Sequence, residues 1–154
     1  MTTRVDNPYK AAPDAIKGMM GVEAAIRASG LEHSLLELVK MRASQINGCA
    51  FCINMHATDA RAAGESEMRL YLLNAWRESS LYTDRERAAL AWTETLTRLA
   101  ESGAPDADYH LVKQSSSEAE QVNLTLAIGA INLWNRLQVG LHGQHADVPV
   151  HAAA

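Results

Sequence analysis

The sequence has no surplus of positive charge and no long apolar run. Its 154 residues include 14 lysines and arginines against 18 aspartates and glutamates, so the formal net charge is -4. Proteins that bind nucleic acid need basic residues to neutralise phosphates, so we expect no nucleic-acid partner. The apolar-leaning run at 124–134 is about half as long as a membrane span, and the polar N-terminus has no signal-peptide core. A cytoplasmic protein with no membrane partner is expected.

Strand signals are also nearly absent. No segment alternates apolar and polar residues with β-branched enrichment, whereas apolar residues recur at helical spacing throughout. The sequence therefore predicts an all-α fold, in one domain over residues 1–154. Helices are expected from Pro13 to the stop at Ser29–Gly30, from about Glu32 to Ile46, from near Cys49 to Gly64, over 65–76, in a long helix after Thr83–Asp84, in a short piece after Pro105, and from about Ser117 to Val139.

The last predicted helix is apolar on more than one face. Its apolar residues are Val122, Leu124, Leu126, Ile128, Ile131, Leu133, Trp134 and Leu137. A domain of this size has little interior to surround such a helix, so the helix is either central or meets another subunit. We therefore expect a homo-oligomer, and we expect the tail from His142 onward to fray.

Cysteine is scarce, but the two cysteines lie together in NGCAFCINMH at 47–56. Cys49, Cys52 and His56 are three and four residues apart, so one helix presents all three side chains on the same face. The unpaired amides and the dipole of a helix N-terminus stabilise a thiolate there. A second nearby cysteine can trap a sulfenic acid as a disulfide. In a reducing compartment this pair is more typical of catalysis or metal binding than of a permanent staple.

Glu37 lies on the preceding predicted helix, and the Asn47–Gly48 turn brings it back toward the cysteines. If the two helices fold back antiparallel, Glu37 lies level with about residue 58. At about 1.5 Å of rise per residue, His56 is then about 3 Å away along the axis and Cys52 about 9 Å away. A relay from Glu37 through His56 to Cys52 could take the proton of the thiol and later return it to a leaving group.

Other interpretations of the cysteine pair stay open. The two cysteines could be small core residues. They could also bind zinc together with His56 and a fourth ligand from Glu37, His33 or the tail histidines, in a helical binding or assembly module without turnover, although no second CxxC is present. The residues also leave open which thiol is the more reactive, because the helix dipole favours Cys49 whereas a neighbouring base favours Cys52.

Residues 35–65, LLELVKMRASQINGCAFCINMHATDARAAGE, resemble the core motif of the alkylhydroperoxidase AhpD-like family, within the carboxymuconolactone decarboxylase superfamily. The shared pattern is a glutamate, a CxxC that begins twelve positions after it, and a histidine four positions after the second cysteine. Downstream, YTDRERAALAWTETLT at 82–97 and INLWNRL at 131–137 are similar to flanking helices of that family. The decarboxylases of the superfamily are poorer templates, because they lack the cysteine pair.

The resemblance implies an all-α trimer or hexamer that acts as a thiol-dependent peroxidase without metal, haem or another cofactor. Carried over by position, Cys52 corresponds to the peroxidatic cysteine, Cys49 to the resolving cysteine, and Glu37 with His56 to the proton relay. The implied partners are an organic hydroperoxide or hydrogen peroxide as substrate, and an external dithiol or thioredoxin-like protein as reductant.

One position departs from the family pattern. Well-known alkylhydroperoxidases carry a histidine immediately before the second cysteine, where this chain has Phe51. That proton donor is therefore missing, and a disulfide reductase with another substrate stays open as an alternative. Met41, Met55 and Trp134 are candidates either for lining a substrate pocket or for filling the core.

Overall fold

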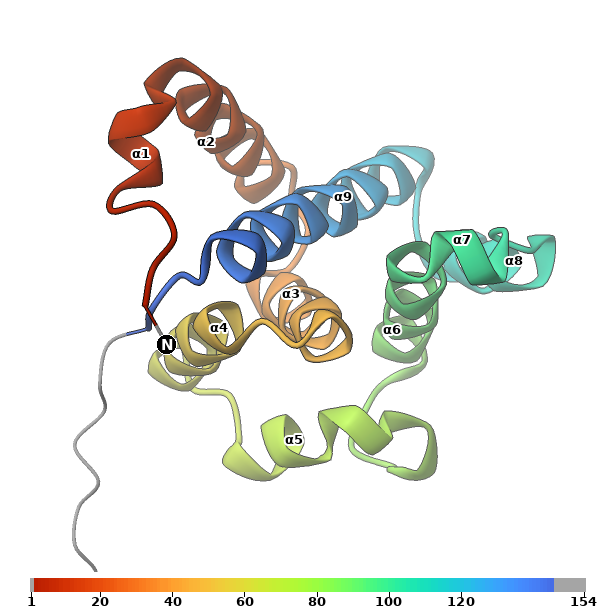
Figure 1. The fold of residues 1–154 in the computed structure, drawn as a ribbon. Coiled ribbons are helices and arrows are strands. Elements are labelled where there is room, and N and C mark those ends of the chain that lie inside the picture. Colours follow the sequence, from red (N-terminus) through yellow and green to blue (C-terminus); the bar gives the residue numbers. More distant parts are fainter. Residues whose placement is uncertain (1, 146–154) are drawn as a thin grey trace, which may run out of the picture.

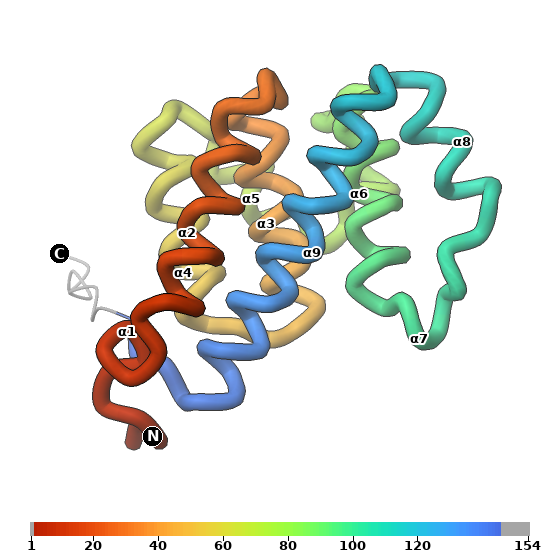
Figure 2. The backbone as a smooth tube through the Cα atoms, turned by 90° about the horizontal axis from the view of Figure 1, so that it is seen from above, coloured from red at the N-terminus to blue at the C-terminus, as the bar shows by residue number. Residues whose placement is uncertain are grey.

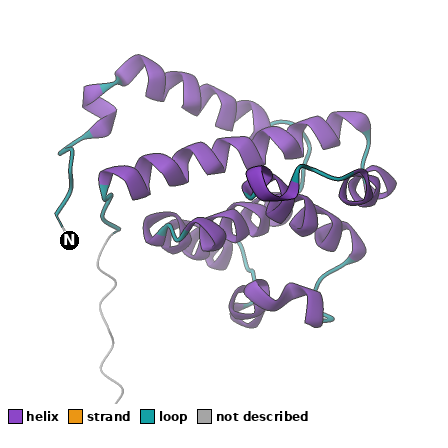
Figure 3. Cartoon of the chain, turned by 45° about the vertical axis from the view of Figure 1, so that its right-hand side comes forward, coloured by secondary structure: helices purple, strands orange, loops and turns teal. Residues whose placement is uncertain are grey.

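The computed structural model describes residues 2–145, and these residues form helices and connecting loops without a strand (Figure 3), which confirms the all-α prediction. The helices are α1 (Pro8–Ala11), α2 (Pro13–Arg27), α3 (His33–Asn47), α4 (Ala50–Ala62), α5 (Glu67–Leu72), the 3-10 helix η1 (Leu73–Glu78), α6 (Asp84–Thr97), α7 (Leu99–Ser102), α8 (Asp106–Ser115) and α9 (Glu118–Leu141). The tail is predicted to fray, and its residues 146–154 lie outside the described residues.

Helix α3 forms the centre of the fold. It lies between α4 and α6, and α9 crosses it (Figure 1). Every residue of α3 from Leu35 to Ser44 is buried. Leu35 and Val39 belong to an apolar cluster with residues of α6 and α9, whereas Leu38 and Met41 belong to a second cluster with residues of α4, α5, η1 and α6. Because α3 is enclosed on all sides, its polar side chains must find partners inside the protein.

Two capping boxes fix the starts of α6 and α9. The Thr83 and Ser117 hydroxyls accept from the amides of Glu86 and Glu120, and the two glutamates accept in return from the cap amides. Such reciprocal bonds satisfy amides that have no partner within the helix. The start predicted at Thr83–Asp84 is therefore confirmed, although α6 ends at Thr97 and α7 follows as a separate turn.

The chain departs from the predicted helices in two places. The helix expected over 65–76 is α5 followed by η1, with a kink at Ala75. A 3-10 helix aligns residues three apart, and this spacing buries Leu70, Leu73 and Trp76 together in one apolar cluster. In addition, α1 precedes the first predicted helix, because the Asn7 side chain caps the Lys10 amide at 3.0 Å.

The N-terminal helices lie against α9 (Figure 2). The Arg4 amide donates to the Leu141 carbonyl at 2.9 Å, and the ring of Tyr9 stacks on that of Trp134 with centroids 6.4 Å apart. Helices α2 and α4 both contact α9, and both border the cavity described below.

Helix α9 presents apolar side chains on two faces, as its sequence indicates. Leu124, Ile128 and Ile131 are buried in the core. Further apolar side chains on α9 are exposed in the single chain: Val122, Leu126, Leu133 and Val139. The homo-oligomer stays a prediction. Over the described residues, no helix combines the length and the apolar character that crossing a membrane requires.

Candidate active site

A tight turn between α3 and α4 positions the cysteine pair. Gly48 ends α3 in the left-handed conformation (φ 66°), which a glycine adopts without steric cost. The amide of Cys49 then donates to the Ser44 carbonyl at 2.9 Å. Cys49 is the N-cap of α4, and its sulfur accepts from the amide of Cys52 at 3.3 Å. The turn therefore fixes both cysteines at the N-terminus of a helix.

Cys49 and Cys52 form a disulfide in the structure, with their Cα atoms 5.4 Å apart. Both residues are 1% exposed and belong to an apolar cluster with Ala43 and Ile131, against which Phe51 and Trp134 pack. The pair is thus neither a surface staple nor a set of two isolated core residues. It is a buried disulfide within an apolar shell.

Glu37 and His56 meet across the α3–α4 hairpin. His56 Nδ1 lies 2.8 Å from Glu37 Oε2, and both side chains are buried. Burial alone would raise the pKa of the Glu37 carboxyl, but the hydrogen bond and charge of His56, with smaller contributions from Lys40 and His33, lower it below its ordinary value. Glu37 is therefore a carboxylate that orients the imidazole, at the short distance that the hairpin geometry predicts.

The Glu37 carboxylate also determines which nitrogen of His56 carries a proton. A carboxylate can only accept, so Nδ1 donates to it, and in the neutral ring Nε2 is left with its lone pair. Nε2 is buried, and no side chain of the described residues forms a hydrogen bond with it. An unpaired acceptor is costly in an apolar interior. Such a lone pair can accept a proton from a group placed beside it.

His56 and Cys52 line a cavity of about 290 Å³ between α2 and α4, which we call the cysteine cavity. Cys49 does not line it. The apolar residues of its wall are Tyr9, Met20, Phe51, Met55, Ile131 and Trp134. Of the three residues proposed to line a pocket or fill the core, Met55 and Trp134 line this cavity, whereas Met41 is buried in an apolar cluster. The cavity is of a size to admit a small organic molecule.

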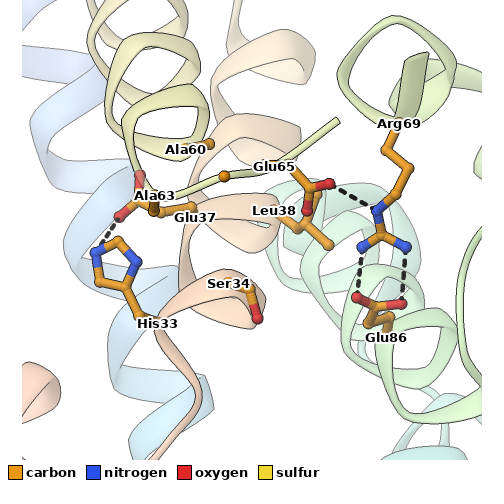
Figure 4. Close-up of a pocket in the computed structure, with 10 residues that line it drawn as sticks. His33, Ser34, Glu37, Leu38, Ala60, Ala63, Glu65, Arg69 and Glu86 are labelled. Carbon is orange, nitrogen blue, oxygen red and sulfur yellow. Dashed lines mark hydrogen bonds and ion pairs between the residues drawn. The ribbon is translucent and has the colours of Figure 1, made fainter. Parts of the chain in front are cut away.

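A second cavity of about 280 Å³, which we call the rear cavity, lies beyond Glu37 (Figure 4). On one side of it, His33 Nε2 lies 3.9 Å from Glu37 Oε1. On the other side, Arg69 pairs with Glu65 at 2.9 Å and with Glu86 at 2.6 Å. Glu37 lines both cavities, so its carboxylate forms part of the wall between them.

The possible metal ligands group differently from the zinc set considered from the sequence. Ligand atoms of Glu37, His56 and Asp59 lie within 4.8 Å of one another among the described residues, and neither cysteine belongs to this group. The two sulfurs are bonded to each other in the structure. His33 faces the other oxygen of Glu37. The geometry therefore favours redox chemistry of the cysteines over their use as zinc ligands.

One ion pair of the cysteine cavity is not expected from the sequence. Lys40 is buried and pairs with Glu23 of α2 at 2.7 Å. Both residues line the cavity. A sign of this was present, because Lys40 lies three residues after Glu37, on the same face of its helix. The position of α2 over that face could not be read from helical spacing.

The comparisons with known proteins agree with this geometry. Residues 13–95 match the sequence model of the carboxymuconolactone decarboxylase family. An uncharacterized protein, YdfG of Bacillus subtilis (strain 168), is 42% identical over 139 residues, which cover 90% of this chain and 95% of that protein. A crystal structure from Agrobacterium tumefaciens, of a protein of unknown function suggested to be an antioxidant defence protein AhpD, is 47% identical with a TM-score of 0.92, covering 96% of this chain and 100% of that one.

More distant structures share the fold alone. The debrominase Bmp8 is 18% identical, with a TM-score of 0.77 over 89% of this chain and 74% of its own length. A variant of that enzyme has been crystallised with 2,3,4-tribromopyrrole. The same helical scaffold therefore carries different chemistries, and the residues of the site must decide between them.

Proposed function

Because the chain belongs to the carboxymuconolactone decarboxylase family and carries a CxxC disulfide beside a Glu–His pair, we propose that it is an AhpD-like, thiol-dependent peroxidase. One observation carries the proposal: Cys52 and His56 line the same cavity, and His56 is held by a buried carboxylate. This arrangement suits a thiol that must lose a proton before it attacks and a base that must later return that proton.

In the proposed reaction the Cys52 thiol gives its proton to Nε2 of His56. The thiolate attacks one oxygen of the hydroperoxide, so that an S–O bond forms and the O–O bond breaks. The departing alkoxide takes the proton from His56 and leaves as an alcohol, with Cys52 as a sulfenic acid. The Cys49 sulfur then attacks the Cys52 sulfur and releases water, which forms the disulfide seen in the structure.

The position of the two sulfurs supports Cys52 as the attacking residue. Cys52 lines the cavity, whereas Cys49 lies behind it and caps the helix. An external dithiol would attack Cys52 to reset the enzyme, and Cys49 would leave as a thiolate. The Cys52 amide and the helix N-terminus stabilise that thiolate, and a stabilised thiolate leaves faster. The reductant is therefore proposed to be a dithiol or a thioredoxin-like protein.

The apolar wall of the cysteine cavity supports an organic hydroperoxide over hydrogen peroxide as the preferred substrate. An alkyl or aryl group can bury apolar surface against Phe51, Met55 and Trp134, at about 25 cal/mol per Å². Hydrogen peroxide gains nothing from these contacts. We also propose a homo-oligomer, because α9 exposes apolar side chains in the single chain, and the family resemblance implies a trimer or hexamer.

The test is dithiol-dependent reduction of cumene hydroperoxide by three forms of the protein. The wild-type protein should turn over, and Cys52→Ser should be inactive. Cys49→Ser should consume one equivalent of peroxide and then hold a sulfenic acid that dimedone labels at Cys52. Turnover by Cys52→Ser, or dimedone labelling elsewhere, would overturn the assignment.

The alternative function, a zinc-bound assembly module, would instead show one equivalent of zinc in protein purified without chelator, and no peroxide consumption.

A further inference from the structure

We propose that the His56–Glu37 pair exchanges protons with solvent through the rear cavity, and that His33 is the side chain that carries them. The chemistry that this path serves rests on the proposed peroxidase function. The path itself is a property of the three side chains, and it can be measured without peroxide.

The two oxygens of Glu37 face different partners. Oε2 lies 2.8 Å from His56 Nδ1, and Oε1 lies 3.9 Å from His33 Nε2. The carboxylate is buried, whereas the side chain of His33 is 55% exposed. His56, Glu37 and His33 therefore form a series that begins at the cysteine cavity and ends at the surface. The last gap is longer than a hydrogen bond, but a small rotation of the exposed imidazole or one water spans it.

The proposed reaction needs such a second path. A dithiol reductant gives two protons to solvent as it is oxidised, and formation of an alcohol and water takes two protons up. A dithiol that attacks as a thiolate has already given its protons to solvent, so the Cys52 and Cys49 thiolates that reduction releases must regain protons from solvent, and His56 is placed to return one of them to Cys52. An organic substrate or a reductant that fills the cysteine cavity displaces water from it, which closes that side to proton exchange. The rear cavity has room for several waters at about 30 Å³ each.

Among the titratable side chains around the rear cavity, His33 is the one placed for this task. Glu65 and Glu86 both pair with Arg69 on the opposite side of the cavity. Other charged groups near the relay are engaged elsewhere or lie on the side of the cysteine cavity: Glu32 pairs with Arg85, Lys40 pairs with Glu23, and Asp59 lines the cysteine cavity. A histidine, moreover, takes up and releases protons near neutral pH.

The first test measures how fast the ring proton that His56 shares with Glu37 exchanges with water, by NMR of protein labelled with 15N-histidine. In His33→Ala we expect this exchange to slow by about 10²-fold, because the path loses a positioned proton-transferring group. Added imidazole, which can occupy the space left by the missing ring, should restore the wild-type rate. The matched control is His110→Ala, because His110 is an exposed histidine of α8 that lines neither cavity.

A wild-type exchange rate in His33→Ala would overturn the proposal. So would slowed exchange that imidazole does not restore, since that result indicates a structural effect of the substitution. In turnover, His33→Ala should lower kcat near neutral pH without changing KM, and imidazole should again restore it. If the protein proves to have no peroxidase activity, the exchange rates still decide whether the path exists, so that failure of the function and failure of the path are told apart.

Discussion

Two buried glutamates, Glu94 and Glu37, show how the same side chain supports structure in one place and chemistry in another. Glu94 of α6 accepts from Trp76 at 2.9 Å, from Arg42 at 2.8 Å and from Arg77. Glu37 of α3 accepts from one buried partner, His56, which is itself left with an unpaired nitrogen at a cavity wall.

The difference lies in how completely each carboxylate is satisfied. Burial alone would raise the pKa of both, and their hydrogen bonds lower both below the ordinary value of 4.5. Around Glu94, two guanidinium groups and an indole donate to the carboxylate, and none of these groups can act as a base. Around Glu37, the imidazole partner can itself accept and release a proton. A satisfied network fixes a fold, whereas an incompletely satisfied pair marks a site where a reaction can occur.

The same substitution at both positions separates the two roles most clearly. We expect Glu37→Gln to lower peroxidase turnover by about 10² to 10⁴-fold, because His56 loses the charge that makes it an effective base. The pH profile should shift upward, since more hydroxide is then needed to form the thiolate. The free energy of unfolding should fall by only about 1 kcal/mol, because the amide oxygen can still accept from Nδ1. Steady-state kinetics between about pH 5 and pH 9 measures the pH profile of turnover in both proteins. An unchanged profile in Glu37→Gln would remove Glu37 from the relay.

Glu94→Gln should show the opposite pattern. It leaves the buried Arg42 without its counter-charge, which we expect to lower the free energy of unfolding by about 3–5 kcal/mol. Turnover per folded molecule should stay at the wild-type level. Urea denaturation and the peroxidase assay on the same samples test both halves of this expectation. A loss of activity without a loss of stability would show that Glu94 also serves the reaction.

Acid should destabilise the protein through the same carboxylates. A pKa that is lower in the folded than in the unfolded state contributes stability above the unfolded value, and this contribution is lost as the pH falls through the folded value. Because the pKa values of Glu94 and Glu37 are both lowered, the free energy of unfolding should fall as the pH drops below about 4.5. Glu94→Gln should show a smaller fall over the same range, and an equal fall would mean that other carboxylates account for it.

The smallest effect is expected at the exposed partner of Glu94. The side chain of Arg77 is 55% exposed, so its ion pair is screened by solvent. Arg77→Ala should therefore lower the free energy of unfolding by about 0.2–1 kcal/mol and should leave turnover unchanged. A loss as large as that of Glu94→Gln, measured in the same urea series, would show that the surface arginine rather than Arg42 is the main partner.

Local patterns in the sequence predict much of this molecule. Helical spacing and capping residues give most of the helices, and the Asn47–Gly48 turn with Glu37 and His56 at matching distances predicts the pair that the structure brings into contact. These features depend on residues that are near one another along the chain. The roles given to Cys52, Cys49, Glu37 and His56 in turnover stay predictions until the variants are measured.

Contacts between distant segments could not be predicted. Glu94 resembles any polar residue of an amphipathic helix, and nothing local shows that Arg42, Arg77 and Trp76 converge on it. In the same way, the cysteine cavity exists because α2 lies opposite α4, and the rear cavity exists because Arg69 and Glu86 face α3. The path through His33 depends on that long-range packing.

A count of free thiols on reduced, metal-free protein, before and after one equivalent of an organic hydroperoxide, tests whether the cysteine pair reduces peroxide. We predict the loss of two thiols per chain, their return on addition of a dithiol, and no loss of the remaining thiol in Cys52→Ser. If both thiols remain free after peroxide is added, the cysteine pair is not a peroxide-reducing centre and the proposed function is wrong.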